Sequence, residues 1–205
     1  MNRLYTIPGS CSTGLHVLLN RLGETFEVVK RDDVANYEEL VPTNQVPALE
    51  TEDGLLTEGA SIVLYLLEKH DALPTSAEEL REFRQWLLFN YATLHATYSK
   101  LFMVGVQRPV AHEESRDELI AHVSDRLSTL WSIVENRPSE REFMVGNAPP
   151  VIDYLLAIYA NWNHAAPTAR IEIGPRARRL IQKVVGLPEF AQAIEREGID
   201  YRLAA

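Results

Sequence analysis

The sequence predicts a two-domain α+β protein, in which a small mixed α/β domain is followed by an all-helical domain. Over roughly the first seventy residues, short strand-like segments alternate with helical ones. After the stretch "HDALPTSAEE" the pattern changes, and only long helical windows follow. We therefore expect one domain over residues 1–72, a linker near residues 71–77, and a second domain over residues 78–205.

The first half has the order strand, helix, strand, hairpin. Residues 3–7 (RLYTI) and 26–29 (FEVV) have strand patterns, and the apolar stretch between them, residues 13–22, has helical spacing and stops at Gly23. This order is typical of a parallel strand pair with a helical crossover. The segments "VPALET" and "LLT", joined by the turn pair Asp53-Gly54, predict an antiparallel hairpin.

Helices account for the rest of the chain. In "NYEEL", Asn36 precedes Glu39 by three positions, which predicts a helix start with reciprocal capping. The stretch "EGASIVLYLLEKH" has apolar residues at helical spacing and predicts a third helix of the first domain. In the second half, helical windows are expected over residues 79–104, 113–136, 151–163, 175–185 and 188–197.

Composition excludes several classes of function. With 29 acidic and 20 basic residues and a net charge of −9, the chain is a poor partner for nucleic acid or an anionic membrane. The chain opens on "MNRLYTIPGS" and has no apolar run long enough for a signal peptide or a spanning helix. Because one cysteine cannot form an internal disulfide, we expect a cytoplasmic protein. The six histidines lack metal-ligand spacing, so no metal is expected.

Cys11, the single cysteine, is the first candidate for chemistry. It follows the first predicted strand and precedes the first helix, where the positive end of the helix dipole favours thiolate over thiol. The alternative is a buried, unreactive cysteine. The small, polar or flexible neighbours of Cys11 suit an exposed turn better than a core. In "CSTG", Gly14 stands where a redox pair would have its second cysteine, so a disulfide formed here requires an outside thiol.

Two further pairs of residues suit a peptide-like anionic ligand. A cis bond between Val46 and Pro47 would expose the backbone polar groups of Val46, which can pair with an extended ligand in the manner of an added strand. Glu58 and Gly59 stand at the start of the third predicted helix, where free N–H groups can bind a carboxylate. Glu58 can instead bind an ammonium group, or only stabilise the first helical turn.

Three segments give the chain a family resemblance: "PGSCSTGLH", "PTNQVPALETEDGLLTEGASIVLYL" and, in the helical half, "LHATYSKLF". With these segments in this order, the chain resembles the soluble glutathione transferases, most closely the bacterial beta class. The resemblance implies a thioredoxin-like N-terminal α/β domain and a C-terminal all-α helical bundle domain. It also implies a homodimer with a glutathione site in each interdomain cleft, and glutathione as co-substrate.

The resemblance also implies a role for each matching residue. Cys11 corresponds to the cysteine that lies beside the glutathione sulfur and can form a mixed disulfide with it. Val46, before the cis-proline Pro47, corresponds to the residue whose backbone holds the cysteinyl part of glutathione. Glu58 corresponds to the acidic residue that meets the γ-glutamyl group. His95 corresponds to a histidine that reaches the sulfur region.

Other positions are ambiguous or depart from the family pattern. Ser12 is either a hydroxyl donor to the thiolate or the N-cap of the first helix. Gly59 stands where a serine often follows the acidic residue, so a carboxylate there would rely on backbone N–H groups. Ala96 replaces a basic residue that can follow the histidine. In "PVID", Pro150 breaks the family's capping box, although Asp153 still favours a helix start.

The predicted activity is transfer of the glutathione thiolate to a small hydrophobic electrophile. Two alternatives remain open: glutathione-dependent thiol–disulfide exchange through Cys11, and a non-catalytic module that binds ligands or another protein. The sequence does not identify the electrophile. Its pocket is expected to be lined by the helical half, with four candidate residues: His95, Tyr98, Phe102 and Trp162.

Overall fold

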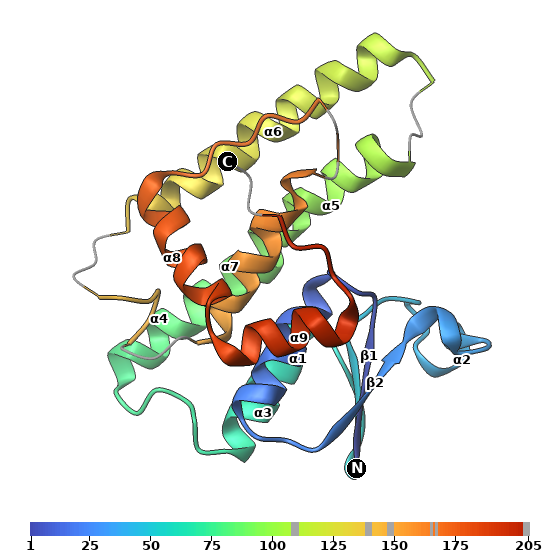
Figure 1. Ribbon diagram of the computed structural model, residues 1–205, viewed down its shortest axis with the longest axis vertical. Coiled ribbons are helices and arrows are strands. Elements are labelled where there is room, and N and C mark those ends of the chain that lie inside the picture. Colours follow the sequence, from blue (N-terminus) through green and yellow to red (C-terminus); the bar gives the residue numbers. More distant parts are fainter. Residues whose placement is uncertain (108–110, 138–140, 147–149, 165, 167, 203–205) are drawn as a thin grey trace.

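The computed structural model describes residues 1–107, 111–137, 141–146, 150–164, 166 and 168–202 (Figure 1). Within them, a four-stranded sheet with its helices forms one part, and helices form the other. The predicted fold class, a two-domain α+β protein with a thioredoxin-like first domain, is confirmed. No helix among the described residues is both long enough and apolar enough to cross a membrane.

The sheet has the strand order β2-β1-β3-β4. Strand β1 (Asn2–Thr6) pairs in parallel with β2 (Phe26–Lys30), which confirms the predicted strand, helix, strand unit. Strands β3 (Ala48–Thr51) and β4 (Gly54–Thr57) form the predicted antiparallel hairpin, and β3 also pairs antiparallel with β1. The central strand β1 therefore ends where the loop to Cys11 begins.

Helices α1 (Cys11–Arg21) and α3 (Gly59–Lys69) pack against each other and against the sheet. Helix α1 starts two residues before the predicted position, because the side chain of Ser10 caps it by accepting a hydrogen bond from the Ser12 N–H. Cys11 is therefore the first residue of α1 rather than part of the preceding turn.

The predicted capping of α2 (Tyr37–Leu40) is wrong. Asn36 precedes this helix in a left-handed conformation, with φ of 54°, and its side chain makes no capping hydrogen bond in the described structure. A capping side chain needs an extended backbone at that position to reach the N–H groups of the first turn. Only the Asn36 carbonyl contributes, by accepting from the Glu39 N–H at 2.9 Å.

The predicted helical windows of the second half are present, and one is subdivided. The first window contains α4 (Ala77–Leu88), a π-helical segment (Phe89–His95), α5 (Ala96–Phe102) and a second π-helical segment (Met103–Gln107). The other helices are α6 (Glu113–Glu135), α7 (Val151–Asn161), α8 (Pro175–Val185) and α9 (Pro188–Glu197). Every residue of α7 up to Ala160 is buried, so this helix forms the centre of the bundle.

Helix α9 returns to the first domain, where it packs along α1 (Figure 1). The buried side chains of His16 on α1 and Glu197 on α9 meet at 2.7 Å, and Glu197 also accepts hydrogen bonds from the Thr13 hydroxyl and the Gly9 N–H. One continuous apolar core therefore joins the two domains. The division at residues 72 and 78 falls between α3 and α4 and stays a prediction.

Asp153 lies in the first turn of α7, as expected, and makes a hydrogen bond to a residue outside this helix. Pro150 is the N-cap of α7, without a side-chain capping bond in the described structure. The Asp153 carboxyl accepts a hydrogen bond from the Met144 N–H at 3.0 Å, so it fastens a separate segment to the helix. Complete burial raises the pKa of Asp153 to about 7.

Candidate functional site

A cavity of about 990 Å³ lies between the sheet domain and the helical domain. The sheet domain lines it with the loop before α1, the loop before β3 and the start of α3, and the helical domain with residues around α5 and the segment after α9. Most of the predicted site residues line this one cavity: Cys11, Val46, Pro47, Glu58, Gly59 and His95.

Cys11 lies in the cavity wall as a buried thiol. Only 4% of the residue is exposed, and its Sγ donates to the Val46 carbonyl oxygen at 3.8 Å. Burial raises the pKa of Cys11 to about 12, although the N–H groups of Cys11 and Ser12 at the helix start act in the opposite direction. The expected thiolate is therefore wrong for the free protein, because loss of solvation outweighs the effect of the helix terminus.

The Val46–Pro47 peptide bond is cis, as the resemblance implied. Both residues line the cavity, and the Val46 carbonyl points at the Cys11 sulfur. The Val46 carbonyl oxygen and the Cys11 thiol are thus adjacent, so one extended ligand can contact both.

Glu58 and Gly59 form the start of α3 and line the same cavity, next to the Pro47 segment because Thr57 pairs with Ala48. Glu58 has φ of 63° and makes no side-chain capping bond in the described part of the chain. The first N–H groups of α3 therefore depend on other partners. A Cβ added at Gly59 would lie 2.4 Å from Cε1 of Tyr91, so only glycine fits beneath this ring. That contact explains why position 59 departs from the serine that often follows the acidic residue.

His95 ends the π-helical segment and lines the cavity. Burial lowers the pKa of His95, so the imidazole is neutral at neutral pH. Its ring packs edge-on against Trp162 at 5.4 Å, and Trp162 packs against Phe102 at 5.2 Å. The indole N–H of Trp162 donates to the Gly9 carbonyl at 2.7 Å, which ties the helical domain to the loop before Cys11.

Two residues that the sequence suggested for the site lie elsewhere. Ser12 is fully buried below the cavity, where its hydroxyl bonds to those of Thr6 at 2.5 Å and Ser10 at 2.6 Å. It is neither at the cavity wall nor the N-cap, because Ser10 is the capping residue. Tyr98 is also fully buried, and its hydroxyl bonds to Asn163 and Trp131 in the core.

Sequence reasoning missed three contributors to the cavity. Tyr91 lies one helical turn before His95, in the π-helical segment. Arg31 reaches the cavity from the end of β2, and residues 198–200 reach it from the segment after α9. The spacing of Tyr91 and His95, four residues apart in "NYATLH", was a usable signal, because such residues share a helix face. Nothing local marked the other two.

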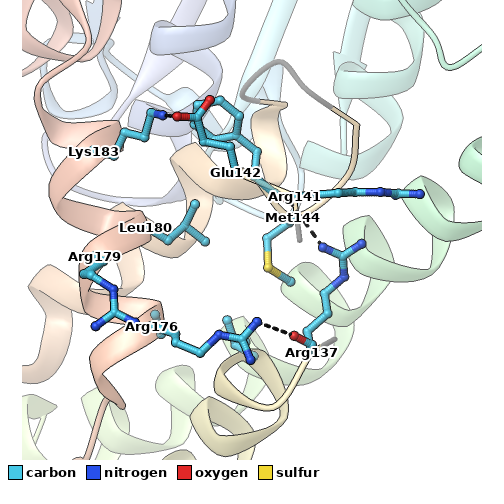
Figure 2. Close-up of a pocket in the computed structure, with 11 residues that line it drawn as sticks. Arg137, Arg141, Glu142, Met144, Arg176, Arg179, Leu180 and Lys183 are labelled. Atoms are coloured by element: carbon cyan, nitrogen blue, oxygen red, sulfur yellow. Dashed lines mark hydrogen bonds and ion pairs between the residues drawn. The ribbon is translucent and has the colours of Figure 1, made fainter. Parts of the chain in front are cut away.

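A second cavity, of about 280 Å³, lies between the end of α6 and α8 (Figure 2). Its walls carry five cationic side chains: Arg137, Arg141, Arg176, Arg179 and Lys183. Several of these charges are matched within the protein, since Arg137 and Arg141 both pair with Glu82, and Lys183 pairs with Glu142. No predicted site residue lines this cavity, so the interdomain cavity is the candidate active site. Among the described residues, no group of three potential metal ligands is present.

The fold and the cavity define a class of protein: a thioredoxin-like domain joined to a helical domain, with a cysteine and a cis-proline at the interdomain cavity. The family model "Glutathione S-transferase, N-terminal domain" matches residues 4–75. The glutathione S-transferase GstA of Escherichia coli O157:H7 is 26% identical over 209 residues, which cover 96% of this chain and 99% of GstA. Over residues 4–75 and over most of its length, the chain is therefore similar to glutathione S-transferases.

Solved structures show the same fold. A glutathione S-transferase from Xylella fastidiosa superposes with a TM-score of 0.85 at 20% identity, covering 97% of this chain and 100% of that one. A bacterial beta class enzyme from Sphingomonas chungbukensis has a TM-score of 0.80 at 23% identity, covering 96% and 98%. A sphingomonad glutathione S-transferase complexed with glutathione has a TM-score of 0.80 at 22% identity, covering 96% and 99%.

Proposed function

We propose that this protein transfers the thiolate of glutathione to a small hydrophobic electrophile. One observation carries the proposal: a single interdomain cavity is lined by a thiol, by the backbone of a cis-proline loop and by a helix N-terminus with an acidic residue. These groups match the thiol, the peptide and the γ-glutamyl end of glutathione. A related transferase of the same fold holds glutathione, which supports the assignment.

In this proposal, the backbone of Val46 pairs with the cysteinyl part of glutathione. Glu58 meets the γ-glutamyl ammonium group, and the first N–H groups of α3 meet the neighbouring carboxylate. Since the Cys11 thiol now donates to the Val46 carbonyl, a ligand that pairs with that carbonyl releases the thiol toward the glutathione sulfur. The electrophile would then lie against Phe102 and Trp162 on the helical side.

The raised pKa of Cys11 gives this residue a specific role in conjugation. A thiol that stays protonated can donate a hydrogen bond to the glutathione thiolate, which stabilises the charge that attacks the electrophile. The thiol proton of glutathione leaves to solvent, a carbon–sulfur bond forms, and an aryl halide substrate would release halide. Cys11 itself is neither oxidised nor bonded in this scheme.

Thiol–disulfide exchange is the second candidate, and the position of the single free cysteine in the cavity wall favours it. In that reaction the Cys11 thiolate attacks the glutathione sulfur of a mixed disulfide and expels the substrate thiolate. A second glutathione thiolate then attacks the glutathione sulfur bonded to Cys11, which yields oxidised glutathione and restores the Cys11 thiolate. Burial opposes the first step, because it disfavours the thiolate.

Two assays on the wild type and on Cys11→Ala separate these functions. We expect glutathione conjugation with an aryl halide to persist in Cys11→Ala, with a rate lowered about 10-fold by the loss of one hydrogen bond to the thiolate. Cys11→Ser, which keeps a donor, should fall between the two. Exchange with a glutathione mixed disulfide that is fast in the wild type and absent in Cys11→Ala would favour the second candidate.

A non-catalytic binding role is the third possibility, and calorimetry tests it. Glutathione binding without turnover of aryl halides or mixed disulfides would indicate a carrier or docking module. Absence of binding at millimolar glutathione would contradict the proposed function itself.

We also propose that the protein is a cytoplasmic homodimer. The reduced cysteine suits the cytoplasm, and large apolar side chains such as Leu88 on α4 and Ile133 on α6 are exposed on the chain. Sedimentation velocity at micromolar concentration should give a mass near twice the 23.2 kDa of one chain. A monomer at all concentrations would contradict the dimer.

A further inference from the structure

The hydroxyl of Tyr91 is a buried polar group without a hydrogen-bond partner among the described residues. Tyr91 lines the interdomain cavity, and its ring lies 6.5 Å from that of His95. Buried hydroxyls in folded proteins are nearly always bonded, and an exception requires a physical reason. Tyr91 packs against the apolar core and also lines the cavity, so it belongs to both.

The position of this hydroxyl is fixed by its contact with Gly59. The Tyr91 Oη lies 2.5 Å from the place that a Cβ of residue 59 would occupy. Gly59 is the first residue of α3, so the phenol of the helical domain rests on the helix N-terminus of the sheet domain. The first N–H groups of a helix have no intrahelical acceptor, and Glu58 makes no side-chain bond to them in the described structure.

The groups gathered here form a set with defined chemistry. Burial raises the pKa of Tyr91 well above its usual value, with a further contribution from nearby Cys11, so the phenol stays protonated and acts as a donor. The helix N–H groups are also donors and carry partial positive charge. Glu58, one residue earlier, is anionic and lines the same cavity. The phenol and the helix N–H groups can bind a carboxylate, and the Glu58 carboxylate can bind an ammonium group. Together they suit the amino acid end of a ligand, which carries both groups.

We propose that Tyr91 is a glutathione-binding residue, whose hydroxyl donates a hydrogen bond to the α-carboxylate of the γ-glutamyl group at the start of α3. The inference rests on the proposed function and adds a side chain of the helical domain to glutathione recognition. Gly59 is part of the same proposed binding site, because any larger residue at position 59 would displace the Tyr91 ring. A carboxylate docked on the α3 N–H groups meets the edge of this ring, and a small rotation of the phenol completes the bond.

The matched control is Tyr159. Its hydroxyl is also buried without a partner among the described residues, but Tyr159 is fully buried and does not line the cavity. Tyr91→Phe and Tyr159→Phe thus each remove one unpartnered hydroxyl, and only the first removes one at the helix N-terminus. Neither change should lower the melting temperature, because no bond within the protein is lost.

The test measures dissociation constants by calorimetry for two ligands. The first is glutathione, and the second is 4-aminobutyryl-cysteinyl-glycine, which lacks only the α-carboxylate of the γ-glutamyl group. We expect Tyr91→Phe to weaken glutathione binding about 10-fold, as for a lost hydrogen bond to a charged group. The same change should alter binding of the second ligand less than about 2-fold, and Tyr159→Phe should leave both constants unchanged.

A penalty that is equal for the two ligands, or no penalty for either, overturns the role of Tyr91 while leaving glutathione binding intact. Wild-type protein that binds neither ligand overturns both this inference and the proposed function. A rescue gives an independent arm: Tyr91→Ala removes the ring, and Gly59→Ser in that background supplies a hydroxyl from the other side. The double variant should bind glutathione more tightly than Tyr91→Ala, and a failure to do so counts against the proposal.

Discussion

The two domains contribute to the interdomain cavity in different ways. The sheet domain supplies backbone groups, the Cys11 thiol and the charged side chains of Glu58 and Arg31. The helical domain supplies whole aromatic side chains, among them Tyr91 and Trp162, from helices whose other faces form the core. Backbone N–H and C=O groups can bind the peptide groups that all peptide-like ligands share. The aromatic side chains determine the size and shape of the rest of the cavity. Under the proposed function, glutathione recognition would be concentrated in the first domain and electrophile selection in the second.

Tyr91 is an exception to this division between the domains. It belongs to the helical domain by sequence, yet its hydroxyl lies at the start of α3. The contact between Tyr91 and Gly59 shows why the division between the domains is not strict: a site between two domains needs groups that reach across.

The largest expected effect comes from Glu197, through which the helical domain holds the loop of Cys11. Glu197→Ala removes the buried acceptor for the Thr13 hydroxyl, the buried partner of His16 and the acceptor for the part-buried Gly9 N–H. We expect a loss of about 3 kcal/mol in the free energy of unfolding, as for breaking a buried pair on one side. Urea denaturation measures it.

Glu195→Ala is the matched control, because Glu195 lies on the same helix and is exposed. Its effect should stay within about 0.5 kcal/mol. If both variants lose equally little free energy of unfolding, α9 does not stabilise the first domain. The idea that the helical domain holds the Cys11 loop in place would then be wrong.

The sequence predicted the sheet domain's part of the site better than the helical domain's part. Val46 and Pro47 lie in a loop, and Cys11 and Glu58 lie at helix starts. Neighbours along the chain determine the conformation at such positions, so short motifs were sufficient. His95 was found by resemblance. Tyr91 and Trp162 were harder to assign, because the face of a helix that meets a cavity depends on its packing, and a π-helical segment changes its phase.

The ionisation of Cys11 could not be predicted for a related reason. The position of Cys11 near a helix start is a local property and was predicted to within two residues, but burial is produced by residues distant in sequence. Desolvation then decides the pKa. The burial of Ser12 was unpredictable for the same reason, since neighbouring residues at a helix start differ in whether they face the cavity or the core.

The second prediction concerns Asp153, whose carboxyl group is buried in the helical domain. Since its folded-state pKa is about 7 and its usual value 3.8, the native state binds its proton more tightly than the unfolded chain does. The stability associated with this proton is present below about pH 3.8 and is lost progressively as the pH rises to about 7. Asp153→Asn, which cannot ionise, should therefore gain stability relative to the wild type over this range.

Asp153→Ala provides the complementary measurement, because it leaves the buried Met144 N–H without its acceptor. We expect a loss of about 1 kcal/mol at pH 4, where the wild-type carboxyl is protonated. Denaturation midpoints of the three proteins between pH 4 and 8 separate the two effects. Parallel curves for Asp153→Asn and the wild type would show that this carboxyl does not titrate in the range.

The smallest expected effect on activity is that of Ser12→Ala. This variant tests whether Ser12, next to Cys11 in the chain, belongs to the core rather than to the cavity wall. Ser10 lines the cavity and caps α1, whereas Ser12 lies inside, bonded to Thr6 and Ser10. Removing its hydroxyl should lower the free energy of unfolding by about 1 kcal/mol, because the buried Thr6 hydroxyl and the part-buried Ser10 hydroxyl lose a partner. Conjugation of an aryl halide should change less than about 2-fold. A large fall in turnover with unchanged stability would instead bring Ser12 into the reaction, and the sheet domain would then contribute a side-chain hydroxyl to the sulfur site as well as backbone groups and a thiol.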